Sequence, residues 1–200
     1  MSAVSFDSMV LIYAGVAPSN HITPAPDFNE LKTRSLMLLH DISEKQTACI
    51  LSAIVLSELL VHVPQGKTGQ FSVEFSTQFI VAPFDLRASS IAAELWSKYK
   101  VEKAKSQGGL PKADRSVLRA DCLIVASVRA MGVTDFYSHD KNCRAFARLA
   151  GMNAHDLPEI EKSMVGKWMA ADINAGLDLP APTKPMKGDR PKRKKKRPRQ

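Results

Sequence analysis

Residues 48–63 read ACILSAIVLSELLVHV, in which a short apolar run passes through Ser52 into a longer apolar stretch. Ala48–Leu51 has the length and composition of a buried β-strand, and Ser52 is a favourable N-cap for a helix over Ala53–Val63. One acid, Glu58, lies inside this apolar helix. The stretch therefore predicts a strand followed directly by a helix that carries a carboxylate in an unfavourable setting.

The rest of the chain predicts the same alternation of short apolar strands and helices. Further strands are expected at Ala3–Phe6, Phe79–Ala82 and Val133–Ser138. Helices are expected at Met9–Gly15, Asp27–Glu44, from PFD (83–85) to about Glu102, Arg115–Met131 and Asn142–Ala150. Loops are expected at APSNHITPAP (17–26) and GGLPKAD (108–114). This alternation predicts an α/β fold, a three-layer α/β/α sandwich around a mostly parallel sheet.

Length and composition favour one domain that lies outside a membrane. With 200 residues and 44% hydrophobic content, the chain is long enough for one well-buried core. The longest apolar run, Ile50–Val63, is interrupted by Glu58 and is shorter than a bilayer requires. The N-terminus MSAVSFDSMVLIYAG lacks the basic region of a signal peptide. Three widely spaced cysteines, Cys49, Cys122 and Cys143, fit reduced thiols, so a cytoplasmic location is expected.

The C-terminal part differs in composition from the rest. We expect a domain over residues 1–157, a helical extension over 158–178 and a disordered, Pro-rich basic tail over 179–200. The tail holds ten Lys and Arg residues against Asp189 alone, a net charge of +9, so with +8 for the whole chain the rest carries about −1 and is nearly neutral. Its PKRKKKRPR string fits an RNA-binding arm, and in a eukaryotic cell it would equally fit a nuclear localisation signal.

Two acids follow predicted strands. Asp7 ends the strand Ala3–Phe6, and Asp140 closes the strand that begins at Val133. The carboxyl ends of parallel strands open onto a common crevice, so the two carboxylates meet if their strands are neighbours. Each also has a simpler interpretation, because Asp7 could cap the next helix and Asp140 could be a turn residue.

Two further acids lie on predicted apolar helices. Helical spacing places each on an apolar stripe: Ile54 and Val61 for Glu58, and Val125 and Val128 for Asp121. Buried carboxylates require a partner, yet neither apolar stretch contains Lys or Arg. Both acids could instead lie at the solvent edge of their helices. Otherwise, four acids in one crevice would repel each other, and a hard cation such as Mg²⁺ or Mn²⁺ would relieve the repulsion.

Together, the four acids and the sequence around each of them resemble the PIN-domain ribonuclease family, and within it the VapC type of bacterial toxin. FDSMVLIYA (6–14) looks like the family's first strand and leading Asp, and LSAIVLSELL (51–60) looks like the second strand and the Glu-bearing helix. RADCLIVASVRAMGV (119–133) looks like the helix of the third acid, and SHDKNC (138–143) like the turn of the fourth. APFD (82–85) and the helix after it match the middle of the pattern, so the resemblance covers most of residues 1–157.

The resemblance implies a PIN-like fold and a Mg²⁺- or Mn²⁺-dependent endoribonuclease that leaves 5′-phosphate and 3′-hydroxyl ends. Asp7, Glu58, Asp121 and Asp140 would hold one or two ions, with Ser138 and Ser8 as supporting hydrogen-bond donors. RNA would be the substrate, an antitoxin protein and a second copy of the chain would be partners, and no other cofactor is implied. The longer body, the extra helix and the basic tail depart from the family pattern and bear mainly on the toxin role.

Two other functions compete with the nuclease as interpretations of this sequence. The main alternative is a non-catalytic nucleic-acid-binding module that uses the basic tail. A phosphatase of the D-x-D kind is disfavoured because Met9 occupies the position of its second Asp. Asp135 is a reserve site residue, although alternation along VTDFYS places it on the surface or in a turn.

Overall fold

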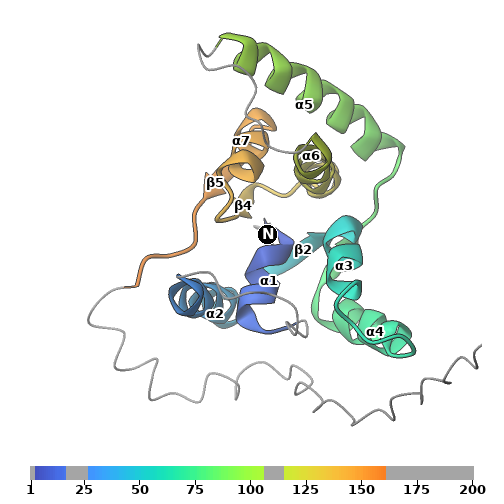
Figure 1. The fold of residues 1–200 in the computed structure, drawn as a ribbon, viewed down its shortest axis with the longest axis vertical. Helices are drawn as coiled ribbons and strands as arrows, with labels where there is room; N and C mark the ends of the chain where they lie inside the picture. The colour runs from blue at the N-terminus through green and yellow to red at the C-terminus, as the bar shows by residue number, and fades with distance from the viewer. Residues whose placement is uncertain (1–2, 17–26, 106–114, 161–200) are drawn as a thin grey trace, which may run out of the picture.

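The computed structural model describes residues 3–16, 27–105 and 115–160, and within these ranges it contains one five-stranded sheet. The strands lie in the order β3-β2-β1-β4-β5, and every neighbouring pair is parallel (Figure 1). Their bounds are β1 Ala3–Phe6, β2 Ala48–Ser52, β3 Ile80–Ala82, β4 Asp135–Tyr137 and β5 Asn153–His155. The sheet is therefore wholly parallel, which confirms and sharpens the predicted fold class.

Helices cover both faces of this sheet. On one side lie α1 (Ser8–Ala14), α2 (Phe28–Glu44), α3 (Ala53–Leu60) and α4 (Thr68–Gln78) (Figure 1). On the other lie α5 (Leu86–Lys105), α6 (Arg115–Ala130) and α7 (Lys141–Leu149), and α3 also contacts α6 at the rim of the sheet. The predicted three-layer α/β/α arrangement is confirmed.

The order of the strands decides which segments meet. β1 is central and pairs with β2 on one side and β4 on the other. The register places Phe6 of β1 beside Tyr137 of β4, and the Asp7 amide donates to the Tyr137 carbonyl at 3.3 Å. The chain segments that follow β1 and β4 therefore leave the sheet side by side, as the sequence required for Asp7 and Asp140 to meet.

The core lies between the sheet and its two helical layers. Central strands of a parallel sheet are buried on both faces, which favours apolar residues in them. Phe6, Leu51 and Phe136 are fully buried on the three central strands. Val125 and Val128 on α6 are equally buried. Burial of such side chains is the main favourable contribution to folding, on the order of 2 kcal/mol for each.

Two elements were not predicted from the sequence. β5 has only the residues Asn-Ala-His and owes its strand geometry to pairing with β4, where Asn153 lies opposite Asp135. α4 begins at Thr68, within the stretch PQGKTG (64–69). Phe75 is its one buried residue among those described, so the apolar pattern of this helix is weak. The other predicted helices and strands agree with the structure to within a few residues; α3, for example, ends at Leu60 instead of Val63.

Several expectations lie outside the described residues. These are the loops at 17–26 and 108–114, the helix from Ile160 to Ala175 beyond its first residue, and the basic tail at 179–200. Among the helices that the structure describes, none combines the length and apolar character needed to span a bilayer.

Candidate active site

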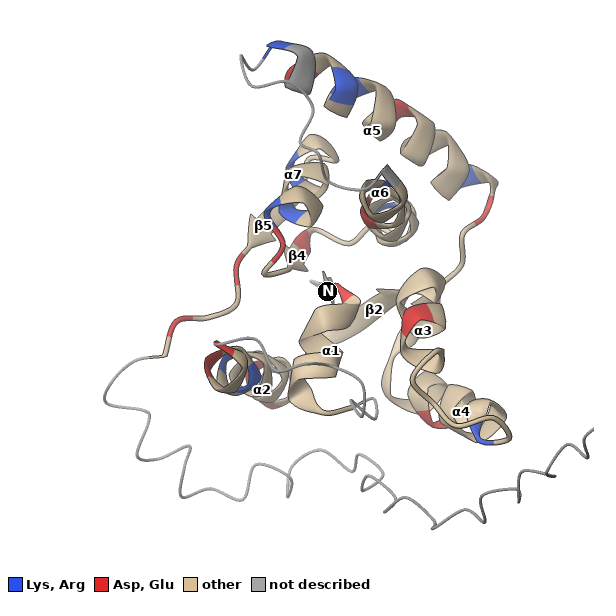
Figure 2. Ribbon diagram, in the orientation of Figure 1, with Lys and Arg blue, Asp and Glu red and all other residues tan. Residues whose placement is uncertain are grey.

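A pocket of about 350 Å³ opens where the carboxyl end of β1, the start of α7 and helices α3 and α6 meet. All four acids singled out from the sequence line it: Asp7, Glu58, Asp121 and Asp140. Figure 2 shows red, acidic segments on α3, on α6 and at the point where the chain enters α1, around the same central region of the molecule. The other lining residues come from the start of α1 and from α6: Ser8, Met9, Ser116, Val117, Ala120 and Ile124.

Asp7 is held rigidly at the N-terminus of α1. One of its oxygens, Oδ1, accepts the Val10 amide at 3.3 Å, so Asp7 is the N-cap of this helix. The other, Oδ2, accepts the hydroxyl of Ser138. Burial raises the pKa of Asp7 to about 6; the hydrogen bonds from Ser138 and Val10 oppose this rise, while the negative charges of Asp140 and Glu58 add to it.

Asp140 is joined to Asp7 through Ser138. The Ser138 side chain is fully buried, and its Oγ accepts the Asp140 amide at 2.9 Å while donating to Asp7. Asp140 itself caps α7, since its Oδ1 accepts the Asn142 amide at 2.6 Å. The simpler interpretation of Asp7 as a helix cap is thus also real, and Asp140 caps a helix as well; these caps fix the two carboxylates at the pocket.

Asp121 is the acid least compensated by its surroundings. Its Oδ2 is buried and accepts no hydrogen bond from the residues that the structure describes. Burial, together with the negative charges of Asp140, Asp7 and Glu58, raises the pKa of Asp121 to about 7. Val125 and Val128, on the same face of α6, are fully buried, as the predicted apolar stripe requires.

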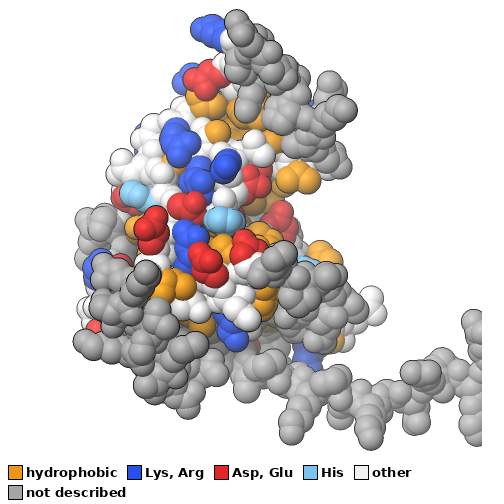
Figure 3. Space-filling model, turned by 60° about the vertical axis from the view of Figure 1, so that its left-hand side comes forward, with side chains coloured by type: hydrophobic (Ala, Val, Ile, Leu, Met, Phe, Trp, Pro, Cys, Tyr) orange, Lys and Arg blue, Asp and Glu red, His pale blue; other side chains and the backbone are white. Residues whose placement is uncertain are grey.

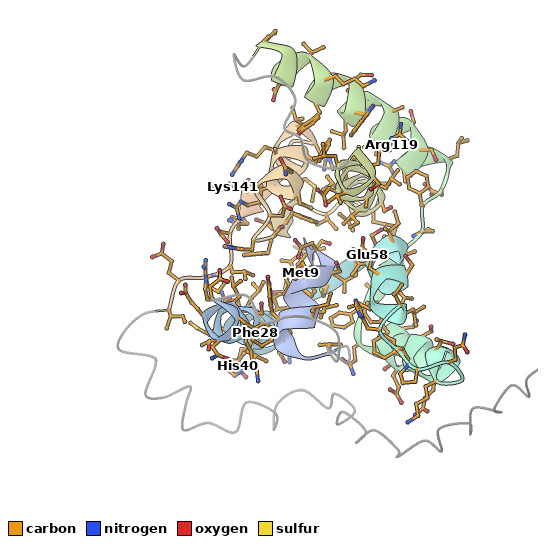
Figure 4. All side chains as sticks on the ribbon, viewed as in Figure 1. Met9, Phe28, His40, Glu58, Arg119 and Lys141 are labelled. Atoms are coloured by element: carbon orange, nitrogen blue, oxygen red, sulfur yellow. The ribbon has the colours of Figure 1, made fainter. Side chains whose placement is uncertain are left out.

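Glu58 lies in a different setting. Its side chain is only partly buried, and Val61 on the same predicted stripe is 81% exposed. The predicted buried stripe is therefore wrong for this helix, because α3 ends at Leu60 and Val61 lies beyond it. Figure 4 shows Glu58 on α3 close to Met9 at the start of α1, so Glu58 reaches the pocket from its rim.

No cation balances these charges in the described part of the chain. None of the ion pairs formed there involves Asp7, Glu58, Asp121 or Asp140. Burial is the main cause of both raised pKa values, and four carboxylates without a basic partner add to the rise because they disfavour one another's ionisation. The pocket is electrostatically suited to a cation.

The pocket offers oxygen ligands of the kind that a divalent ion needs. In residues 3–16, 27–105 and 115–160, no group of three or more His, Cys, Asp or Glu side chains is arranged so that it could hold a metal ion as it stands. Mg²⁺ nevertheless keeps several of its waters and needs only one or two carboxylates from the protein. The unpartnered Oδ2 of Asp121 and the oxygens of Asp7 are ligands of this kind, so the residues fit Mg²⁺ or Mn²⁺ chemically.

The remaining predicted residues fall into three settings. Ser8 is buried and lines the pocket, whereas Ser138 supports it from behind through Asp7. Asp135 lies outside the pocket on β4 and bonds Thr134, Asn153 and His155. The sequence interpretation missed the other lining residues of α6, which are Ser116, Val117, Ala120 and Ile124. Helical spacing from Asp121 could have identified Val117 and Ile124, which lie four residues before it and three after it.

A second, larger cavity of about 720 Å³ lies between the end of α2, the start of β2 and β3, and the end of α4. Its walls are mainly apolar and include Phe6, Leu39, Ile42 and Phe79. No acid, histidine, lysine or arginine lines it, and burial raises the pKa of its one thiol, Cys49. It offers no groups for acid–base or metal chemistry.

Solved structures of VapBC are among the proteins to which this chain is similar. No family model matches the sequence, and no curated protein matches it. A crystal structure of VapBC2 from Rickettsia felis bound to a DNA fragment from their promoter is 16% identical, with a TM-score of 0.48, and the match covers 78% of this chain and 99% of that chain. A crystal structure of DNA-bound VapBC from Salmonella typhimurium is 15% identical, with a TM-score of 0.48 and coverages of 79% and 100%. Similarity at this level carries no information about the side chains of the pocket.

Proposed function

We propose that this protein is a divalent-metal-dependent endoribonuclease whose active site is the acidic pocket. The observation that carries the proposal is the meeting of four carboxylates from four separate chain segments in one pocket, without a basic partner among the described residues. Such an arrangement costs stability, and strongly shifted carboxyl pKa values of this kind cluster at functional sites.

Each residue has a separate role in this proposal. Asp7 and Asp121 supply the most deeply buried oxygens, and Asp140 and Glu58 add negative charge from the rim. Ser138 holds the Asp7 carboxylate in one orientation by donating to its Oδ2. A bound Mg²⁺ or Mn²⁺ would supply Lewis-acid activation of water and neutralise charge on the scissile phosphate.

The substrate and the biological role are the less direct parts of the proposal. RNA is chosen because the sequence motifs resemble VapC-type PIN domains and because the basic tail would neutralise phosphates. The same resemblance supports a toxin restrained by an antitoxin protein. A second copy of the chain as a partner and a cytoplasmic location stay predictions from the sequence.

The test is cleavage of single-stranded RNA by the purified full-length chain. We expect cleavage with Mg²⁺ or Mn²⁺, none with EDTA, and products with 5′-phosphate and 3′-hydroxyl ends. Asp121→Asn should abolish cleavage, whereas Asp135→Asn, the matched change outside the pocket, should preserve it. Equal cleavage by wild type and the Asp121 variant would contradict the proposed site.

The alternative is a non-catalytic nucleic-acid-binding module, and the charge of residues 184–200 favours it as a second candidate. This segment contains ten Lys and Arg residues against Asp189 alone. RNA binding that needs the tail, without cleavage at any Mg²⁺ or Mn²⁺ concentration, would establish this alternative. Growth arrest on expression of wild type, but not of Asp121→Asn, would support the toxin.

A further inference from the structure

A buried arginine lies directly behind the acidic pocket. Arg144, on the first half of α7, is 8% exposed and does not line the pocket. Its Nη1 lies 2.5 Å from the Ser138 carbonyl oxygen and 3.1 Å from the His139 carbonyl oxygen. The guanidinium therefore donates to two backbone carbonyls of the short loop that joins β4 to α7.

Asp156, in the segment after β5, pairs with both Arg144 and His139. Asp156 Oδ2 lies 3.0 Å from Arg144 Nη1, and Asp156 Oδ1 lies 3.1 Å from His139 Nδ1. Asp156 also pairs with Arg34 of α2 at 3.5 Å, while Arg34 donates to the Leu157 and Pro158 carbonyls. Figure 3 brings this side of the molecule forward and shows acidic, basic and His side chains intermingled on it.

The loop held by Arg144 is the one that connects two of the pocket acids. Ser138 Oγ donates to Asp7 and accepts from the Asp140 amide, so the position of Ser138 determines how these two carboxylates lie relative to each other. Arg144 fixes Ser138 from the opposite side, through its carbonyl. The contacts form a continuous chain from Asp156 through Arg144 and Ser138 to Asp7.

The geometry points to Arg144, oriented by Asp156, as a positioning residue that presets the Asp7–Asp140 pair for a divalent cation. This inference rests on the proposed metal-dependent function. A buried guanidinium is costly unless it is fully paired, and here its partners are the loop carbonyls and Asp156. Groups that orient metal ligands in this way typically change metal affinity by about 10–100-fold when they are replaced.

The test is Mn²⁺ binding to the full chain without RNA, measured from the electron paramagnetic resonance signal of free Mn²⁺ well below the unfolding temperature. Arg144→Lys keeps the charge but loses the planar fork, and we expect its Mn²⁺ affinity to fall about tenfold. Arg148→Lys is the matched control, because Arg148 is exposed one turn further along the same helix. It should bind Mn²⁺ within twofold of wild type.

A purely structural role gives a different result. In that case Arg144→Lys would lower the unfolding temperature, but the folded protein would bind Mn²⁺ as wild type does, and the positioning role would be overturned. If Arg144→Lys does not fold, Asp156→Asn tests the same role at a partly exposed residue. This variant should weaken Mn²⁺ binding at least threefold. Unchanged Mn²⁺ affinity would again overturn the positioning role. Absence of Mn²⁺ binding by wild type would instead contradict the proposed metal site itself, and the positioning role with it.

Discussion

Ser138 and Asp7 are 131 positions apart in the sequence, yet the hydroxyl of Ser138 donates a hydrogen bond to the Asp7 carboxylate. The contact exists because β1 and β4 are neighbours and both residues directly follow their strands. It is a hydrogen bond to the ionised form of Asp7, so it opposes the rise in the pKa of Asp7 that burial causes. This contact is the direct connection between the first and the last of the four acids.

Replacing Ser138 by Ala should weaken metal binding more than it weakens the fold. The change removes a donor to Asp7, so the pKa of Asp7 should rise further and Mn²⁺ affinity at pH 7 should fall about tenfold. The free energy of unfolding should fall by about 1 kcal/mol. Ser127→Ala is a matched control, since Ser127 is fully buried but donates only to the Leu123 carbonyl at 2.8 Å. Equal Mn²⁺ affinities of the two variants, by calorimetry, would refute the role of Ser138.

The metal-free protein should lose stability as pH rises from about 4 to about 8. The folded protein holds protons on Asp7 and Asp121 more tightly than the unfolded chain, because burial raises their pKa values from 3.8 to about 6 and about 7. Their contribution is therefore complete below pH 3.8 and is lost as pH passes through those values. The combined loss should be on the order of 2–4 kcal/mol.

The pKa values of Asp135 and Asp156 are lowered in the folded protein, so these groups act in the opposite direction and in a separate window below pH 3.8. Urea unfolding in EDTA at pH 5, 6, 7 and 8 measures the slope. Excess Mg²⁺ should flatten it, because an ion that binds only the folded protein offsets the repulsion. Stability that is constant from pH 5 to pH 8 in EDTA would show that these carboxyls are not strained.

Asp121→Asn and Asp135→Asn should change stability in opposite directions. At pH 8 in EDTA, the first removes an unpaired buried charge and should raise the free energy of unfolding by about 1–2 kcal/mol. The second removes the charge and one of the two acceptor oxygens of Asp135, whose contacts with Thr134, His155 and Asn153 lower its pKa, and should reduce the free energy of unfolding by about 1 kcal/mol. Thermal unfolding of the two variants beside wild type checks both signs. A destabilised Asp121 variant under these conditions would contradict the electrostatic account of the pocket.

The strands and the four acids could be predicted because their signals are local. Continuous apolar runs identified β1 and β2, and a carboxylate after a strand or within an apolar helix is visible in a few residues of sequence. Asp7 and Asp140 could meet only if β1 and β4 are adjacent strands, and no local sequence pattern determines which strands are adjacent. That condition is met in the structure.

The parts that could not be predicted depend on contacts made only after folding. β5 is a strand because β4 offers it a parallel edge, and its residues have no strand pattern of their own. Arg144 looks like an ordinary charged residue on a helix, and its burial follows from the placement of Asp156 beyond β5. The exposure of Val61 follows from the early end of α3. Each depends on the boundary or partner of an element, which is the least local information in a sequence.

Deleting residues 184–200 should separate RNA binding from RNA cleavage. The segment's ten basic residues and one acid give it a net charge of +9, more than the +8 of the whole chain, so its loss should weaken RNA binding at low salt. If the tail neutralises about six phosphates of single-stranded RNA, log affinity should fall with log salt at a slope near −4 in wild type, and the slope should be close to zero after deletion. Fluorescence anisotropy at several salt concentrations measures this, with a Gly-Ser tail of equal length as the control for length alone.

Cleavage should respond differently to the same deletion, because all four pocket acids lie in the described domain and none in the tail. A short RNA at saturating concentration should therefore be cut by the truncated chain at a rate within about threefold of wild type, while KM rises at low salt. Loss of kcat with unchanged KM would place the tail in the chemistry of the pocket. An unchanged salt slope would mean that the phosphates are bound by the domain, whose charge is close to neutral.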